Sequence, residues 1–203
     1  MMGPVYVVTD PDAPLSVSDQ ALAAARGGAW AVQLRDKRLS DDAFAALVTA
    51  LLPKLDALGV KLIVNDRADV AIRTGAHGLH IGQSDGDAAE IRARLPRDML
   101  LGLSVETVAQ AGGVTGGVDY IGAGPVRATA TKPDHAAPIG IDGLAQIVAV
   151  TSVPCYAIGG LKPGDAAAVK RAGAVGMAVV SAVTRAPDPC AVTRALFTEW
   201  SDA

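Results

Sequence analysis

The sequence predicts a single domain, residues 1–203, with a (β/α)8 barrel (TIM barrel) fold of the α/β class. Eight short apolar segments alternate with eight longer amphipathic segments, and this alternation is typical of parallel strands joined by crossover helices. Polar, glycine-rich motifs follow nearly every apolar segment. An open doubly wound sheet would gather such motifs at one switch point, so the sequence favours the closed barrel.

The predicted strands are short apolar runs, most of them rich in valine, leucine and isoleucine, as expected for buried parallel strands. In chain order they are VYVVT at 5–9, WAVQL at 30–34, KLIVN at 61–65, GLHIG at 78–82, LLGLS at 100–104, VDYIG at 118–122, PCYAI at 154–158 and GMAVV at 176–180.

The predicted helices lie between the strands and after the last of them, and many of their residues are alanines. Their ranges are 16–28, 40–59, 67–75, 86–95, 105–113, 141–151, 163–173 and 188–200. Ser40 is a typical helix N-cap, and Gly28, Gly59, Gly75 and Gly173 are typical helix ends. The fifth helix should be short, because four glycines fall within residues 112–117.

The composition favours a soluble cytoplasmic protein with a single sizeable core. Half of the residues are apolar and 19% are charged, with a net charge of −3, so neither disorder nor a nucleic-acid or anionic membrane surface is expected. Cys155 and Cys190 form no disulfide framework, which fits a reducing cytosol. No apolar run is long enough to span a bilayer, and no secretory signal pattern precedes the first strand.

The segment AVQLRDK at 31–37 carries the first chemical signal. Side chains alternate along a strand, so Gln33, Arg35 and Lys37 share one face. Polar groups pointing into a barrel are costly unless a ligand or a counter-charge meets them, and two cations on one face suggest an anion. Alternatively, the two cations pair with acidic neighbours on a solvated rim. Those neighbours are Asp36, Asp41 and Asp42.

A second signal is the pair of aspartates, Asp66 and Asp85, that follows the third and fourth strands. Two carboxylates at adjacent strand ends suit Mg²⁺, which takes one or two carboxylates and completes its shell with water and phosphate oxygens. Each could instead cap the helix that follows it. His80, within the fourth strand, is expected to be a core histidine with satisfied hydrogen bonds.

Two later loops also suggest an anionic ligand. AIGGLKPGD at 157–165 places glycines before a helix predicted to open at Pro163, so backbone N–H groups could approach an anion, although a plain turn also explains them. Ser181 follows the eighth strand, and phosphates often bind after strands seven and eight of a barrel. The loop from Arg127 to Ile139 has the length and composition of a flap over a ligand.

In order, YVVTD, VQLRDK, IVNDRADVA, GLHIGQSD, GLS, DYIGAGPV with TATK, AIGG and VVSA resemble the thiamine phosphate synthase family over nearly the whole chain. The resemblance implies a (β/α)8 fold, Mg²⁺ as cofactor, and condensation of hydroxymethylpyrimidine pyrophosphate with a thiazole phosphate. It implies that pyrophosphate leaves first, giving a pyrimidine-methyl cation that the thiazole nitrogen captures.

The resemblance also implies a role for each matching residue. Those matching the pyrimidine pyrophosphate site are Gln33, Arg35, Lys37, Asn65, Ser104 and Lys132. Those matching the thiazole phosphate site are Thr129, Thr131, Gly160, Val180 and Ser181. Asp66 and Asp85 match the magnesium ligands, and the predicted catalytic residues are Arg35, Lys37, Lys132 and Ser104.

Two other interpretations remain open from the sequence. A thiazole tautomerase of the related TenI-like group would share the fold, but that group generally lacks the paired aspartates and has a histidine in the segment where Glu106 stands. A non-catalytic barrel that binds a phosphorylated metabolite is the second alternative, and the full set of polar residues at the strand ends argues against it.

Overall fold

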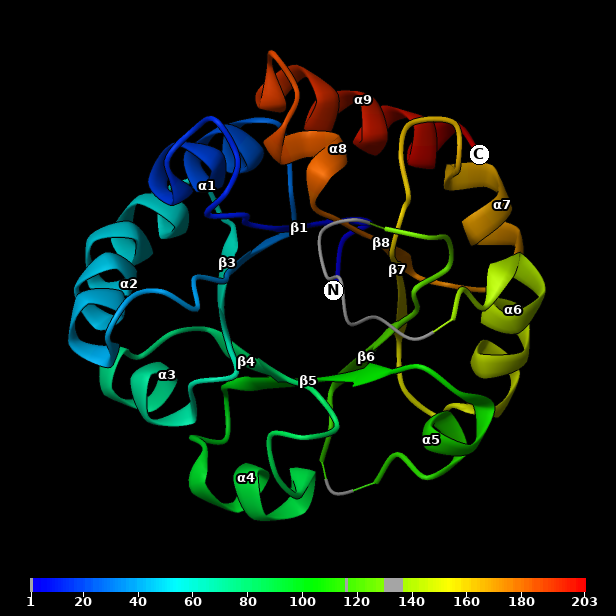
Figure 1. The fold of residues 1–203 in the computed structure, drawn as a ribbon, viewed down its shortest axis with the longest axis horizontal. Coiled ribbons are helices and arrows are strands. Elements are labelled where there is room, and N and C mark those ends of the chain that lie inside the picture. The colour runs from blue at the N-terminus through cyan, green and yellow to red at the C-terminus, as the bar shows by residue number, and fades with distance from the viewer. Residues whose placement is uncertain (1, 116, 130–136) are drawn as a thin grey trace.

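A computed structural model gives the structure of the protein and describes residues 2–115, 117–129 and 137–203. Eight parallel strands follow one another in sequence order around a closed barrel, and the last strand pairs with the first. Figure 1 shows the strands at the centre and the helices in a ring around them. The predicted (β/α)8 barrel is confirmed.

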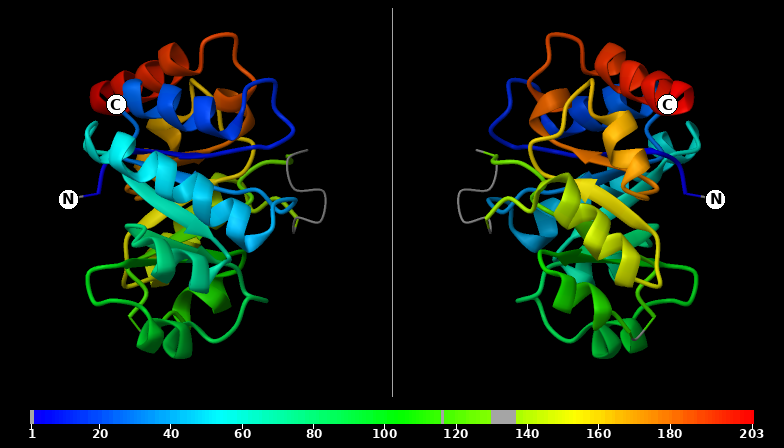
Figure 2. Two further views of the ribbon diagram at one scale, coloured as in Figure 1. Left: turned by 90° about the vertical axis from the view of Figure 1, so that its left-hand side faces the viewer. Right: turned by 90° about the vertical axis from the view of Figure 1, so that its right-hand side faces the viewer.

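Every predicted strand is present, and the observed bounds differ from the predicted ones by two residues at most. The strands are β1 Val5–Val8, β2 Ala31–Leu34, β3 Lys61–Asn65, β4 Gly78–Ile81, β5 Leu100–Val105, β6 Tyr120–Ala123, β7 Cys155–Ile158 and β8 Gly176–Val179. Because all strands run in one direction, their carboxyl ends meet at one mouth of the barrel. In the left view of Figure 2, the N-terminus lies at the left and the loop from β1 to α1, which belongs to that mouth, extends to the right.

The helices are α1 Val17–Arg26, α2 Asp41–Asp56, α3 Ala68–Thr74, α4 Ala88–Arg94, α5 Val108–Gly112, α6 Gly140–Val150, α7 Ala166–Arg171, α8 Ser181–Thr184 and α9 Pro189–Asp202. The fifth is short, as predicted. The one-turn α8 was not predicted. The prediction that the seventh helix opens at Pro163 is wrong: Gly164 has a φ of 99°, outside the helical region, and α7 begins only at Ala166.

Tyrosines fill much of the barrel interior, where branched apolar side chains are usual. Tyr6, Tyr120 and Tyr156 are buried there and contact one another edge to face. Glycines on neighbouring strands make room for these rings. A Cβ atom on Gly102 would lie 2.2 Å from the ring of Tyr120 and 2.5 Å from the imidazole of His80.

Gly102→Ala should therefore destabilise the barrel by about 3 kcal/mol, because the added methyl group overlaps atoms that packing holds in place. The measurement is the free energy of unfolding in urea. Gly112→Ala is the matched control: Gly112 lies in α5 with nothing within 4 Å of the added carbon, so the change should stabilise the protein slightly. Equal unfolding free energies for the two variants would contradict this description of the interior.

Candidate active site at the carboxyl end of the barrel

A chain of hydrogen bonds crosses the barrel interior below the mouth. Gln33 Nε2 donates to the Tyr6 hydroxyl at 2.8 Å, and the hydroxyls of Tyr6 and Tyr120 lie 2.9 Å apart. The Tyr120 hydroxyl lies 3.2 Å from His80 Nδ1, and His80 Nε2 lies 3.0 Å from Ser104 Oγ. We call these five side chains the polar floor. They join β2 to β5 through the centre of the barrel.

The polar floor is uncharged at neutral pH. Burial lowers the pKa of the His80 imidazole from 6.5 to about 4, and the nearby Asp85 carboxylate opposes this only in part. Burial raises the pKa of the Tyr6 and Tyr120 hydroxyls above the ordinary value of 10. The prediction that His80 is a satisfied core histidine is confirmed, since both ring nitrogens have partners.

Gln33, Arg35 and Lys37 were predicted to share a face that a ligand would contact. Gln33 already has a partner within the protein. Gln33 is 4% exposed and already bonded to Tyr6, so a hydroxyl of the barrel interior meets this polar group. Arg35 lies half-buried in the loop after β2, and Thr9 fixes its backbone by accepting from the Arg35 N–H at 3.0 Å. Within the part of the chain that the structure describes, the Arg35 guanidinium has no carboxylate partner.

The alternative in which Arg35 and Lys37 pair with neighbouring aspartates is wrong. Those aspartates pair with other arginines: Asp36 with Arg38, Asp41 with Arg67 and Asp42 with Arg73. Lys37 instead lies 3.6 Å from Asp66. Lys37 is therefore directed toward the carboxylate after β3 and not toward these neighbouring aspartates.

Asp66 and Asp85 lie together, as the sequence predicted. Burial and the contact with the Asp85 carboxylate raise the pKa of Asp66, while Lys37 and Asn65 act in the opposite direction. The Asp66 backbone N–H donates to the His80 carbonyl at 2.9 Å, which holds this residue beside β4. Its φ of 62° is unusual for a residue other than glycine, and such strained backbones cluster at functional sites.

Neither aspartate caps a helix, so that alternative is also wrong. Arg67 occupies the N-cap of α3, and the Asp87 side chain caps α4 by accepting from two backbone N–H groups. Asp85 Oδ2 accepts from the Gly82 N–H at 2.7 Å, which orients the carboxylate within its loop.

The two adjacent carboxylates fit a hard divalent cation. They repel each other when both are ionised, and a cation between them would remove that cost. Among the described residues, no group of three or more acidic, histidine or cysteine side chains could hold a metal. A site with two carboxylates suits Mg²⁺, which keeps several ligand positions for water and phosphate oxygens.

The predicted anion site at the start of α7 is taken by the protein itself. The Glu199 carboxylate of α9 accepts from the N–H groups of Gly164 and Ala166 at 2.8–3.0 Å. The expectation of an external anion at this helix start is therefore wrong. Gly160 remains exposed at the turn after β7, while Val180 and the exposed Ser181 begin α8.

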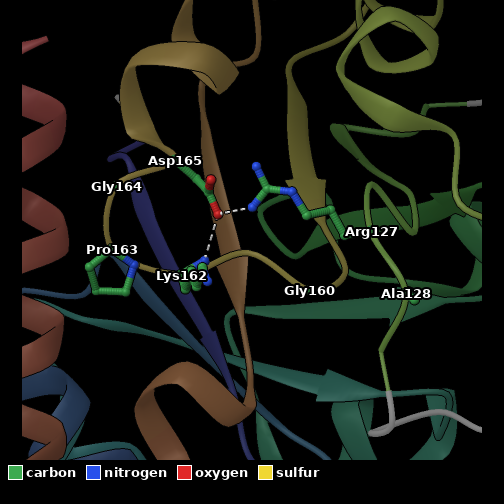
Figure 3. Close-up of a pocket in the computed structure, with 7 residues that line it drawn as sticks. All are labelled: Arg127, Ala128, Gly160, Lys162, Pro163, Gly164 and Asp165. Carbon is green, nitrogen blue, oxygen red and sulfur yellow. Dashed lines mark hydrogen bonds and ion pairs between the residues drawn. The ribbon is translucent and has the colours of Figure 1, made fainter.

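A cavity of about 430 Å³ lies between the loops that follow β6 and β7. Figure 3 shows its lining, in which the Arg127 guanidinium points toward the Asp165 carboxylate. Thr129, predicted to bind the thiazole phosphate, is half-buried two residues after Arg127. Thr131, Lys132 and most of the predicted flap lie outside the described residues, which end at 129 and resume at 137.

Sequence reasoning missed several residues that shape the site, namely Tyr6, Thr9, Asp10, Tyr120 and Arg185. Asp10 is buried and pairs with Arg185 at 3.0 Å, which joins the loop after β1 to the end of α8. The tyrosines could have been found from strand alternation, because Tyr6 and Tyr120 occupy inward positions once the strand phases are set. Asp10 and Arg185 are 175 residues apart in the sequence, so no local pattern could indicate that they pair.

Comparison with known proteins gives a consistent family assignment. The family model described as thiamine monophosphate synthase matches residues 5–183. The chain is 47% identical to a thiamine-phosphate synthase of Roseiflexus sp. (strain RS-1) over 96% of its length and 84% of the relative's. A thiamine-phosphate synthase of Chloroflexus aurantiacus is 47% identical, with coverage of 95% and 90%.

A solved structure also resembles the chain closely. A thiamine phosphate pyrophosphorylase from Pyrococcus furiosus superimposes with a TM-score of 0.89 and 30% sequence identity, covering 98% of this chain and 96% of that one. A 3-hexulose-6-phosphate synthase, 19% identical with a TM-score of 0.73, shares the fold.

The buried, neutral His80 predicts a specific dependence of stability on pH. Its folded-state pKa lies below the unfolded value, so unfolding takes up a proton between about pH 6.5 and pH 4. Stability should fall as pH falls through that window, by about 2–3 kcal/mol at pH 4.5. His80→Gln removes this component. Urea unfolding of both proteins at pH 7 and 4.5 measures it, and an unchanged difference between them at the two pH values would refute a neutral His80.

Proposed function

The chain belongs to the thiamine monophosphate synthase family and makes thiamine phosphate, and we propose that pyrophosphate leaves the pyrimidine substrate before the thiazole nitrogen attacks. The substrates are a hydroxymethylpyrimidine pyrophosphate and a hydroxyethylthiazole phosphate. The observation that carries this proposal is the grouping of Asp66, Asp85 and Lys37. Arg35, two residues before Lys37, has no carboxylate partner among the described residues.

Asp66 and Asp85 would hold Mg²⁺ in this proposal. Their contact with each other, and the raised pKa of Asp66 that results in part from it, support a site built for a cation. When bound, Mg²⁺ would supply positive charge that stabilises the leaving pyrophosphate. Lys37 partly balances Asp66 in the free protein and can turn to a phosphate oxygen once a cation is present.

Arg35 and Lys37 bind the pyrophosphate and stabilise its developing charge. A pair of unit charges 4 Å apart is worth about 4 kcal/mol at an effective dielectric constant of 20. The arginine fork suits phosphate oxygens, and Thr9 holds its backbone in place. Lys132, outside the described residues, is proposed to contribute a third positive charge.

The polar floor suits a cationic intermediate because it carries no positive charge. A protonated His80 would repel a pyrimidine-methyl cation, whereas a pKa of about 4 keeps this imidazole neutral at pH 7. Gln33 and Ser104 offer hydrogen bonds to the pyrimidine ring. The Gln33 amide oxygen has no partner among the described residues and is available to accept one from an exocyclic amino group.

The thiazole phosphate is proposed to bind on the opposite side of the mouth. Gly160, Val180 and Ser181 follow β7 and β8, and phosphates often bind at these positions in barrels. Thr129 and Thr131 would approach from the loop after β6. Binding the thiazole by its own phosphate places its nitrogen next to the cation, which supplies the orientation that the reaction needs.

We further propose that the enzyme works in the cytoplasm on small molecules, with no nucleic-acid or membrane partner. Both cysteines are free, as expected in a reducing compartment. None of the described helices is both long and apolar enough to cross a membrane.

Asp66→Ala and Asp85→Ala should each lower turnover by at least about 100-fold, because each removes a ligand of the proposed Mg²⁺ site. The measurement is thiamine phosphate formation, detected by mass, at several Mg²⁺ concentrations. Asp98→Ala, an exposed aspartate before β5, is the control and should retain full activity. Normal rates for both site variants at low Mg²⁺ would show that the metal assignment is wrong.

Arg35→Ala should lower turnover by about 100-fold, while Arg38→Ala changes it by less than about threefold. The two arginines are three residues apart, but Arg38 already pairs with the exposed Asp12 and the buried Asp36. Steady-state kinetics with varied pyrimidine pyrophosphate measures the difference. Similar losses in both variants would mean that the positive charge of the loop matters and that Arg35 has no particular contact with the leaving group.

A further inference from the structure

Asp165 is a buried carboxylate in the loop between β7 and α7, and its partners come from two different loops. It is 6% exposed. Its Oδ2 atom accepts from the backbone N–H of Lys162 at 3.0 Å and from Arg127 Nη1 at 2.5 Å. Figure 3 shows both contacts as dashed lines converging on this carboxylate. Asp165 thus joins its own loop to the loop after β6.

The two joined loops also touch through their backbones next to Gly160. The Arg127 N–H donates to the Gly159 carbonyl at 3.0 Å. A Cβ atom on Gly160 would lie 2.8 Å from the Ala128 carbonyl oxygen, and one on Gly159 would lie 2.5 Å from Pro125 Cα. Contacts this close leave little room for one loop to move without the other.

The far side of the same loop is fixed as well. The Glu199 carboxylate accepts from the N–H groups of Gly164 and Ala166. The segment from Gly159 to Ala166 is therefore held by α9 at one end and by Arg127 at the other. Both glycines of its first turn have positive φ values, of 99° and 65°. Glycine restricts backbone conformation less than other residues do, so the contacts with neighbouring groups matter for holding this turn in place.

We propose that the Arg127–Asp165 ion pair is a positioning device that sets the Gly159–Gly160 turn for the phosphate of the thiazole substrate. This inference rests on the proposed thiazole phosphate site at Gly160 and Ser181. Neither charged group is proposed to touch the substrate. Loss of the pair should weaken binding of the thiazole phosphate and leave binding of the pyrimidine pyrophosphate, at the opposite side of the mouth, unchanged.

Substitution of Arg127 and substitution of Asp165 should have effects of different size. Removing the Arg127 charge leaves a buried carboxylate with the Lys162 N–H as its one donor among the described residues, and an unpaired buried charge is costly. Removing the Asp165 charge leaves an arginine that is already 44% exposed and can be hydrated. Arg127→Met should therefore be more damaging than Asp165→Asn, which keeps an oxygen to accept from the Lys162 N–H.

The test is steady-state kinetics with each substrate varied in turn. Arg127→Met should raise the KM for thiazole phosphate about tenfold and Asp165→Asn about threefold, with the KM for pyrimidine pyrophosphate changed less than twofold. The double variant should be no worse than Arg127→Met alone, because both changes break one interaction. Arg127→Lys, which keeps the positive charge, should restore most of the loss.

Two control variants show whether a negative result concerns the positioning role of the ion pair or the phosphate site itself. Arg73→Met breaks an exposed ion pair with Asp42 on α2 and α3 and should change neither KM. Ser181→Asp places a carboxylate in the proposed phosphate site and should raise the KM for thiazole phosphate strongly.

If Ser181→Asp raises that KM but Arg127→Met, shown to be folded by circular dichroism, does not, the positioning role is wrong and the phosphate site stands. Equal increases in both KM values for Arg127→Met would also overturn the positioning role. If Ser181→Asp has no effect, the phosphate site and the inference fail together.

Discussion

Closure of eight short parallel strands into one barrel is the constraint on which the rest of the structure depends. A closed ring leaves no strand edge, brings every carboxyl end to one mouth, and encloses an interior that side chains must fill completely. Here the interior is filled largely by tyrosine rings lying against glycines of neighbouring strands, with Gly102 the tightest example against Tyr120. Each buried hydroxyl then needs a hydrogen-bond partner.

The polar floor meets that requirement, and it also places hydrogen-bonding groups next to the mouth of the barrel. The hydroxyls of Tyr6 and Tyr120 are satisfied by Gln33 and His80, which places an amide, a neutral imidazole and the Ser104 hydroxyl just below the loops. The charged groups lie above this floor, where Lys37 after β2 contacts Asp66 after β3, and Asp66 contacts Asp85 after β4. A site of this kind can bind a highly charged pyrophosphate above neutral groups that tolerate a cationic carbon.

The sequence was sufficient to predict the strand order, the strand bounds to within two residues and the placement of Asp66 beside Asp85, because strand alternation and parallel topology determine them. It failed where geometry overrides local pattern. GMAVV continues as an apolar run, yet Val180 leaves the strand conformation and a one-turn helix follows. The start of α7 was misplaced because Gly164 bends the chain, and the Glu199 carboxylate that occupies this region comes from a helix far away in sequence.

We propose that the carboxylates after β3 and β4 form a divalent cation site whose remaining ligand positions are taken by water and the pyrophosphate. The most direct test is electron paramagnetic resonance of Mn²⁺, used in place of Mg²⁺, in the presence of pyrophosphate. We expect one tightly bound Mn²⁺ per chain in the native protein and none in a variant with Asp66→Asn and Asp85→Asn. Undiminished Mn²⁺ binding in that folded variant would contradict the account.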